Sequence, residues 1–544
     1  MHIKVVIRYF LVLQIVLIWW IYELSAQRTS LWQDEMGNPY PSALSGGFQA
    51  PQFSPFDLDG DKVPEIISFD RYSGIPQVWK KKEEIGVYIL TNDIDLEWPV
   101  LHSWMLVRDF NGDGLPDIFT QGNHGIAVYR GKKEGRKIVF EPMRGVSFLD
   151  DSLIFHNRSG GTTNIYHAAT DIPIIEDVDG DGDLDILTFE LSGTYLYFYE
   201  NRAEATGNPL DYVLQHNCWG YFAENLFNDE INLSETDSQC PPPFTVRHAG
   251  STSCLVDYDY NGTMDLILGD IGSGFLKVLL NGGTETEAYI EKIHPEFPHN
   301  DTLAELPFFP AAFRIDVDGD SVSDVVVAGN EFPTFDQQGV WWYRGTSDPE
   351  HPFHFQTREW LIDGHIDLGH YTAPLFFDVN ADGIPDLLIG YQFLDRDQET
   401  LNRIAYFEAI DLNTYRLKDM DFESLSTVLT RGYRPYLTSG DVNGDGAEDI
   451  LIGMSDGSSY LLVHGGFPGQ PFSVGRVEAD WAGLRLRSGA TPELFDVDGD
   501  GDLDVIAGMD NGLIGVWVNT GNQQLAQFNP DLNSAPNINM LGNV

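Results

Sequence analysis

The sequence predicts an all-β fold assembled from repeated small sheets, and three observations support this prediction. An acidic nine-residue pattern, with Asp or Asn at positions 1, 3 and 5 and an acid at position 9, occurs eight times. A short, apolar and often β-branched run follows each copy, as expected of a buried strand. A further apolar run, often aromatic, comes next. Recurrence at intervals of tens of residues indicates a repeat architecture in which each unit packs on its neighbours.

The copies are easily recognised in the printed sequence. They read DLDGDKVPE from Asp57, DFNGDGLPD from Asp109, DVDGDGDLD from Asp177, DYDYNGTMD from Asp257, DVDGDSVSD from Asp316, DVNADGIPD from Asp378, DVNGDGAED from Asp441 and DVDGDGDLD from Asp496.

This oxygen-rich pattern matches the ligand preference of calcium, which takes about 6 to 8 oxygen ligands from carboxylates, carbonyls and water. Side chains at positions 1, 3, 5 and 9 can turn toward one centre, and position 7 would add its backbone carbonyl. Up to eight Ca²⁺ ions are therefore predicted. The predicted ligands are Asp57, Asp59, Asp61, Val63, Glu65; Asp109, Asn111, Asp113, Leu115, Asp117; Asp177, Asp179, Asp181, Asp183, Asp185; Asp257, Asp259, Asn261, Thr263, Asp265; Asp316, Asp318, Asp320, Val322, Asp324; Asp378, Asn380, Asp382, Ile384, Asp386; Asp441, Asn443, Asp445, Ala447, Asp449; and Asp496, Asp498, Asp500, Asp502, Asp504.

The alternative is that Asp, Asn and Gly serve only as turn residues. The regular glycine at position 6 and the shared apolar continuation favour metal loops. Lys62 and Ser321 replace that glycine, so we expect the loops from Asp57 and Asp316 to bind more weakly or to bend differently.

One repeat unit is clearest near the end of the chain. Residues 491–496 are expected to form a first strand, 496–504 the loop, 505–509 a second strand and 513–521 a third. Asp510-Asn511-Gly512 is a hairpin signal between the last two. With a fourth, less regular strand, four antiparallel strands make a β-propeller blade. Eight blades are favoured, with seven as the alternative, and each calcium loop joins the first strand to the second.

The repeats extend over nearly the whole chain, which favours one domain over residues 27–530. Long insertions are expected at about 145–172 and 202–250, and residues 531–544 form a polar tail. Residues 1–26 have a basic start, an apolar run and a small-residue exit, as in a secretory signal peptide. A retained signal anchor is the competing interpretation. Both place the domain outside the cytoplasm.

The eight loops resemble those of the FG-GAP/VCBS repeat family, the calcium-loop β-propellers that include the integrin α-subunit head. Partial echoes of the family's Phe-Gly and Gly-Ala-Pro elements stand at GGFQAP (46–51), SGATP (488–492) and HYTAP (370–374). The resemblance covers about residues 46–525 and implies a secreted, bacterial-type propeller. Integrin heads have seven blades with loops in only some of them, and no leg domains follow here.

Composition excludes some functions. The formal net charge is −51, which would repel nucleic acid phosphates. Cys218 and Cys240 bracket a polar segment and are compatible with a disulfide, whereas Cys254 is expected to be a buried strand residue. The chain has no CxxC pair, so neither zinc nor thioredoxin chemistry is expected.

The favoured function is an extracellular binding or adhesion module with a glycan or protein as partner. No group of residues in the sequence supports redox chemistry or nucleotide binding. The protein is expected to be a monomer, and membrane contact is expected only if the N-terminal segment is retained. Possible sugar-stacking residues are Trp104, Trp219, Trp341, Trp342 and Trp360, for which burial between blades is the favoured alternative. A polysaccharide lyase or hydrolase is the enzymatic alternative, with candidate histidines His156, His167, His216 and His248. A purely structural role in an extracellular assembly is the third hypothesis.

Overall fold

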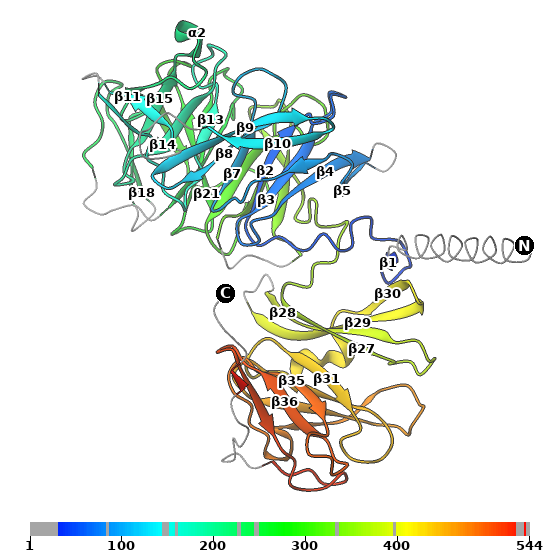
Figure 1. The fold of residues 1–544 in the computed structure, drawn as a ribbon. Coiled ribbons are helices and arrows are strands. Elements are labelled where there is room, and N and C mark those ends of the chain that lie inside the picture. Colours follow the sequence, from blue (N-terminus) through cyan, green and yellow to red (C-terminus); the bar gives the residue numbers. More distant parts are fainter. Residues whose placement is uncertain are drawn as a thin grey trace, which may run out of the picture. The chain divides into compact units, whose positions relative to one another are not determined.

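The computed structural model describes residues 31–82, 86–143, 152–157, 161–225, 230–243, 250–331, 337–394, 399–528 and 538–539. The expected signal peptide, His248 and nearly all of the expected tail lie outside these residues. Among the described residues, the structure contains no helix with the length and hydrophobicity that crossing a bilayer requires. The all-β prediction is confirmed, and Figure 1 shows the strands in chain order.

The described chain separates into two compact units, one formed mainly by residues 44–367 and the other by residues up to 43 and from 368 onward. The single domain predicted over residues 27–530 stays a prediction.

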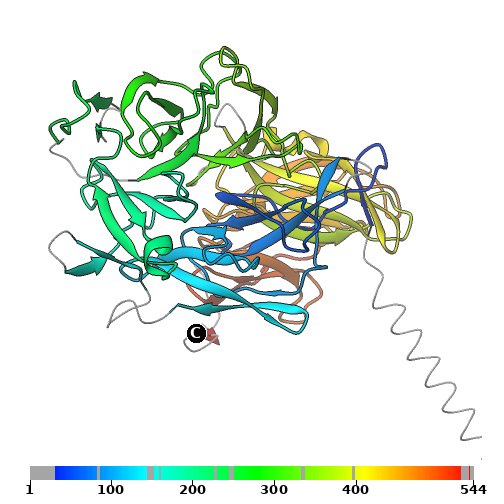
Figure 2. The same ribbon diagram turned by 90° about the horizontal axis from the view of Figure 1, so that it is seen from above.

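Residues 44–367 contain five main sheets, numbered here in chain order and shown from above in Figure 2, in blue to green. They are β2 (Pro51–Phe56), β3 (Glu65–Asp70), β4 (Pro76–Lys82), β5 (Val87–Leu90); β7 (Met105–Arg108), β8 (Asp117–Gly122), β9 (Gly125–Glu134), β10 (Lys137–Pro142) with β6 (Leu96–Glu97); β13 (Ile174–Glu176), β14 (Asp185–Phe189), β15 (Leu196–Asn201), β16 (Tyr212–His216) with β11 (Ile154–His156) and β12 (Thr162–Asn164); β19 (Ser251–Val256), β20 (Asp265–Asp270), β21 (Leu276–Asn281), β22 (Ile290–His294); and β23 (Pro310–Ile315), β24 (Asp324–Gly329), β25 (Val340–Gly345), β26 (Phe353–Thr357).

The short helix α2 (Ala203–Thr206) connects β15 to β16 within the third sheet, and a separate hairpin of β17 (Phe222–Asn225) and β18 (Glu230–Leu233) lies between the third and fourth sheets. This hairpin lies in the expected insertion at 202–250. Within it, Cys218 and Cys240 are free thiols. Burial, and then the neighbouring Cys240 side chain, raise the pKa of the Cys218 thiol. Their disulfide stays a prediction, whereas Cys254 is buried in β19 as expected.

The second unit contains three sheets. They are β27 (His370–Phe377), β28 (Asp386–Leu394), β29 (Thr400–Asp411), β30 (Thr414–Asp419) with β1 (Leu31–Gln33); β31 (Tyr436–Gly440), β32 (Asp449–Gly453), β33 (Ser459–His464), β34 (Val474–Ala479); and β35 (Thr491–Phe495), β36 (Asp504–Gly508), β37 (Leu513–Trp517), β38 (Ile538–Asn539). Two short 3₁₀ helices, η1 (Phe422–Thr427) and η2 (Trp481–Gly483), connect strands of this unit.

The five sheets of residues 44–367 close on themselves. β2 of the first sheet contacts β7 of the second and also β23 of the fifth. The rings of Phe53 and Phe313 meet edge to face across this last contact, with centroids 5.5 Å apart. A small central cavity is lined by the first strand of every sheet. The predicted single ring of eight or seven blades is not confirmed, because the first sheet has the fifth as its neighbour.

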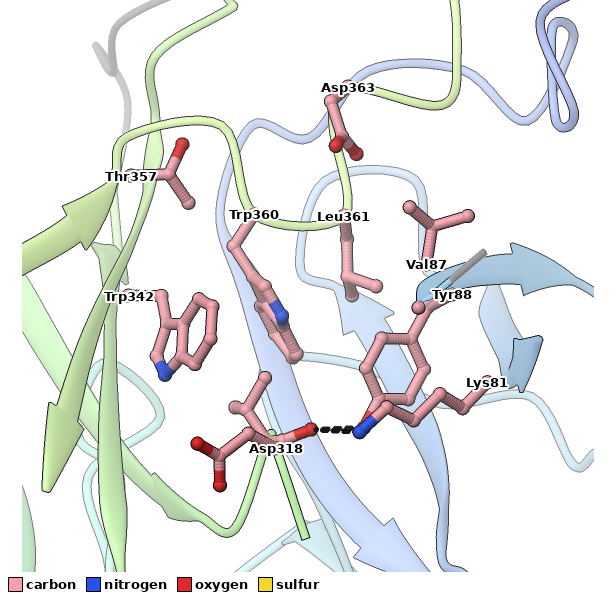
Figure 3. A pocket seen from close by; sticks show the side chains of 11 residues that line it. Lys81, Val87, Tyr88, Asp318, Trp342, Thr357, Trp360, Leu361 and Asp363 are labelled. Carbon is pink, nitrogen blue, oxygen red and sulfur yellow. Dashed lines mark hydrogen bonds between the residues drawn. The ribbon is translucent and has the colours of Figure 1, made fainter. Parts of the chain in front are cut away.

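Most of the predicted stacking tryptophans are structural. Trp104, Trp219, Trp341 and Trp360 are at most 6% exposed, as the burial alternative expected. Trp342 is only half-buried. Trp342 and Trp360 line a pocket where the first and fifth sheets meet, shown in Figure 3.

Candidate metal centres

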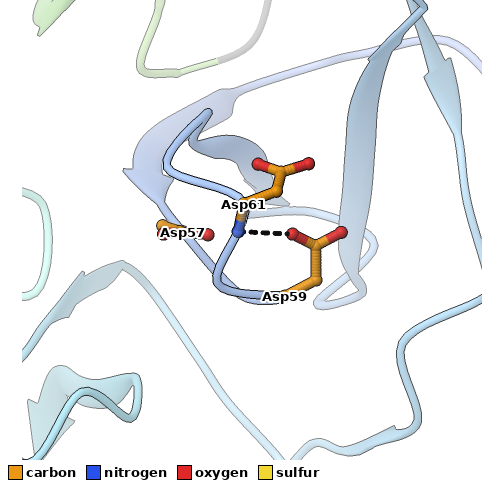
Figure 4. Close-up of side chains that lie close together, drawn as sticks. All are labelled: Asp57, Asp59 and Asp61. Atoms are coloured by element: carbon orange, nitrogen blue, oxygen red, sulfur yellow. Dashed lines mark hydrogen bonds between the residues drawn. The ribbon is translucent and has the colours of Figure 1, made fainter.

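In each of the eight main sheets, the acidic segment joins the first strand of the repeat unit to the second, as predicted. Its local geometry is clear in the loop from Asp57, shown in Figure 4. The Asp57 carboxylate accepts hydrogen bonds from the backbone N–H groups of Gly60 at 2.8 Å and Lys62 at 3.0 Å. Asp59 Oδ1 accepts from the N–H of Asp61 at 3.2 Å, and Asp61 Oδ1 accepts from that of Val63 at 2.8 Å. These short-range bonds hold each carboxylate on the inside of the turn.

The expected exceptions at position 6 do not change the bend. Lys62 and Ser321 have φ of 73° and 69°, in the left-handed region that the glycines occupy in the other loops. Their N–H groups donate to the position 1 carboxylates of Asp57 and Asp316 at 3.0 and 2.9 Å, like the glycines. A different bend is therefore not found. The substitutions instead impose the cost of a left-handed conformation on a residue with a side chain.

Position 4 of the loop requires a left-handed backbone conformation, which was not predicted from the sequence. It has a positive φ in every loop, including Tyr260 at 57° and Ala381 at 59°. Glycine fills this position in the other six loops, and this second regular glycine was the available signal.

The acid at position 9 is the first residue of the second strand and is at most 1% exposed in all eight loops. Asp265 is typical. Its carboxylate accepts from the N–H of Tyr258 at 2.8 Å, at the start of the loop, and from that of Asn281 at 2.7 Å, at the end of the third strand. Position 9 thus ties the loop to two strands, a role that the sequence did not reveal.

Burial of these carboxylates has a marked electrostatic effect. Desolvation, partly offset by the backbone hydrogen bonds, raises the pKa of Asp117 and Asp265 to about 7 and that of Asp185 to about 8. The same cause raises the pKa of Asp324 and Asp449 to about 6. A nearby cation would oppose this effect by favouring the ionised form.

Acidic oxygens converge in five of the eight loops within the described residues. In each of these loops, one carboxylate oxygen from each of three acids lies within 4.8 Å of the others. The groups are Asp57, Asp59, Asp61; Asp177, Asp179, Asp185; Asp257, Asp259, Asp265; Asp316, Asp318, Asp320; and Asp496, Asp498, Asp500.

The loops from Asp109, Asp378 and Asp441 have an asparagine at position 3 instead of an acid. The side-chain oxygens of Asn111, Asn380 and Asn443 each accept from the backbone N–H two residues on, at 2.9 Å. Asparagine therefore has the same place in the loop as the acid, with one charge fewer.

A basic residue of the third strand reaches some loops, which the sequence analysis did not anticipate. Lys80 contacts Asp59, Asp61 and Glu65, and Arg344 contacts Asp318 and Asp320. In the second sheet, Arg130 contacts Asp113 at 3.0 Å. The equivalent third-strand residues in the third and sixth sheets are Glu200 and Glu408, one residue after the partners of Ile186 and Leu387. The eight loops therefore differ in how much of their charge the protein itself neutralises.

The candidate histidines have separate surroundings. His167 is buried, with its ring nitrogens 2.8 Å from the Thr188 hydroxyl and 3.2 Å from the Asp171 carbonyl oxygen. Desolvation lowers its pKa to about 3, so it is neutral and structural. His156 Nε2 lies 3.2 Å from Asp211, and His216 Nε2 lies 3.7 Å from Glu287. The enzymatic alternative stays a prediction.

Comparison with known proteins supports the repeat. Residues 316–389 match the FG-GAP-like repeat model. This span begins at the first residue of the fifth loop and ends in β28, just past the sixth loop. No curated protein matches the chain.

Several solved structures are similar at low identity. An Agrocybe aegerita lectin, described as recognising non-reducing terminal N-acetylglucosamine, is 14% identical over 83% of this chain and 92% of its own, with a TM-score of 0.23. The Pseudomonas aeruginosa periplasmic gluconolactonase is 12% identical over 80% of this chain and 96% of its own, with a TM-score of 0.23. A putative Thermus oxidoreductase (glucose dehydrogenase) is 12% identical over 53% of this chain and 93% of its own, with a TM-score of 0.26.

Proposed function

We propose that the protein is an extracellular binding module of the FG-GAP type, in which acidic loops bind calcium and stiffen a scaffold of small sheets. The partner is a glycan or a protein at a cell surface. The N-terminal sequence supports export, and extracellular calcium is abundant enough to fill sites of modest affinity.

The convergence of three acidic side chains in each of five loops carries this proposal. The donor set consists of oxygen atoms, which suits a hard cation such as calcium. One carboxylate oxygen, Asp257 Oδ1, is buried and has no hydrogen-bond donor. Because an unpaired buried carboxylate oxygen is costly, a bound cation is a natural partner for it. The residues therefore fit calcium.

In each loop, the side chains at positions 1, 3, 5 and 9 and the carbonyl at position 7 would hold the ion. Calcium supplies positive charge to a cluster of like charges. The chain itself supplies the shape, because backbone N–H groups already orient each carboxylate. The position 9 acid also links the loop to the third strand, as Asp265 does by accepting a hydrogen bond from the Asn281 N–H.

Calorimetric titration of the chelator-treated full chain with CaCl₂, together with elemental analysis, tests the metal sites. Calcium should bind and raise the unfolding temperature. Magnesium should do so less, because it demands a tighter octahedral shell. Absence of binding at millimolar calcium would refute the proposed sites.

The binding role needs a separate assay. A glycan array and a pull-down against extracellular surface proteins, each with calcium and with chelator, should give a calcium-dependent partner. Calcium binding without any partner in both assays would favour the purely structural role instead.

A further inference from the structure

The ring of residues 44–367 has a pocket at the contact between its first and fifth sheets. We call it the seam pocket and define it by Lys81, Tyr88, Asp318, Trp342, Trp360 and Asp363. Its volume is about 160 Å³, and it is partly open to solvent. Since pockets for drug-sized ligands have volumes of roughly 300–1,000 Å³, this smaller pocket suits a single ring rather than a longer segment.

Aromatic side chains form its apolar wall and are held firmly in place. Trp360 is 6% exposed and packs edge to face against Phe53 and Tyr88, at centroid distances of 5.3 and 5.8 Å. The Trp342 indole N–H donates to Asp324 Oδ2 at 3.1 Å. Figure 3 shows both indoles and the Tyr88 ring around the cavity. Rigid rings bind a flat apolar face at little cost in side-chain entropy.

Polar groups stand opposite this wall. The Lys81 ammonium and the Tyr88 hydroxyl both donate to the Val317 carbonyl, at 2.9 and 3.2 Å. An ammonium has three N–H donors, so Lys81 can also donate to a ligand. The carboxylates of Asp318 and Asp363 are acceptors on the same lining. Because Arg344 pairs with Asp318, the charges of Lys81 and Asp363 are left to balance each other, and the pocket suits a neutral ligand that carries hydroxyl groups.

We propose that the seam pocket binds one neutral pyranose unit of a glycan. The apolar face of the sugar lies against Trp342 and Trp360, and its hydroxyl groups bond to Lys81, Asp318 and Asp363. This inference rests on the proposed binding function and gives that function a site and a ligand class. A peptide side chain is the competing occupant.

The pocket also shares residues with the fifth acidic loop. Asp318 is position 3 of that loop, Val317 is position 2, and Trp342 donates to its position 9 acid, Asp324. Order in the loop therefore sets the shape of one pocket wall. Because coupling between two sites is reciprocal, sugar binding should strengthen with calcium, and calcium binding should strengthen with sugar.

The test is saturation-transfer NMR on the calcium-loaded full chain. The probes are the methyl glycosides of glucose, galactose, mannose and N-acetylglucosamine, and the best of them is then titrated. Trp342→Ala should weaken its binding about tenfold or more. Thr357→Phe keeps both indoles and fills the pocket from its lining, so it should abolish binding; it also removes the hydrogen bond that the Thr357 hydroxyl accepts from the Glu359 N–H. Trp98→Ala is the matched control, because Trp98 is a half-buried indole that stacks on Phe140 away from the pocket.

The outcomes separate this inference from the wider function. Loss of binding in both pocket variants, with Trp98→Ala unchanged, supports the seam pocket. A sugar that binds all variants equally overturns the pocket but leaves a glycan-binding module. If none of the four glycosides binds but the pull-down captures a protein partner, the sugar is refuted as the ligand and the binding function stands. Failure of the glycosides, the array and the pull-down refutes both.

Discussion

Lys80 offers a direct test of how the protein and calcium share the charge of one loop. Its ammonium contacts Asp59, Asp61 at 3.1 Å and Glu65 at 3.3 Å, and its side chain is 31% exposed. Replacement by methionine keeps the length of the side chain and removes the charge. Exposed ion pairs contribute about 0.2–1 kcal/mol each. Since three acids share one ammonium, we expect a total of about 1–2 kcal/mol.

That stabilisation should be present only without calcium, because an ion in the loop displaces the ammonium from the same oxygens. Lys80→Met should therefore lower the free energy of unfolding by about 1–2 kcal/mol in chelator and change it little in saturating calcium. The same free energy corresponds to about a tenfold gain in calcium affinity for this loop.

Urea unfolding of the full chain in chelator and in millimolar calcium measures both values. Lys132→Met is the matched control, because Lys132 pairs with Glu141 on an exposed strand surface outside any loop. Its effect should be small and equal in both conditions. An equal loss for Lys80→Met in chelator and in calcium would refute the competition, since the lysine would then act independently of the metal.

Two loop ligands, a buried histidine and a ring between the first and fifth sheets can each be tested by substitution. Asp181→Ala and Asp500→Ala remove loop ligands, so each should lower the unfolding temperature in calcium and change it little in chelator, measured by scanning fluorimetry. His167 is buried and neutral with a pKa of about 3. Its stabilisation of the fold should be complete above about pH 6.5, the pKa of histidine in the unfolded chain, and should be lost as the pH falls toward 3. Urea unfolding across this range should show a flatter pH dependence for His167→Gln. Phe53→Ala removes a ring that is only 3% exposed from the contact between the first and fifth sheets. It should lower the free energy of unfolding by about 3–5 kcal/mol, measured by urea unfolding.

Each of these predictions has a contradicting result. Equal losses in calcium and in chelator for the two aspartate variants would mean that these acids are turn residues only. If the free energy of unfolding of His167→Gln depends on pH as strongly as that of the unmodified protein, protonation of His167 is not the cause of that dependence. A loss below about 1 kcal/mol for Phe53→Ala would mean that the first and fifth sheets are not tightly packed at Phe53.

The acidic loops and their flanking strands were predictable from the sequence because their determinants are local. An aspartate at position 1 bonds to N–H groups three and five residues away, as Asp57 does with Gly60 and Lys62. The apolar run that follows each loop forms the second strand for the same reason, since its pattern is complete within a few residues. Such local interactions require particular residue types at fixed spacings, so they appear in the sequence as a regular pattern.

Ring closure and the seam pocket were decided by the tertiary structure alone. Phe53 meets Phe313, and Lys81 meets Val317, across more than two hundred residues of chain. Lys80 reaches its loop only because the third strand pairs beside the second. Periodicity reveals that units repeat, but the number of units that close a ring depends on the angle at which neighbouring sheets pack, and that angle is a sum over many side-chain contacts.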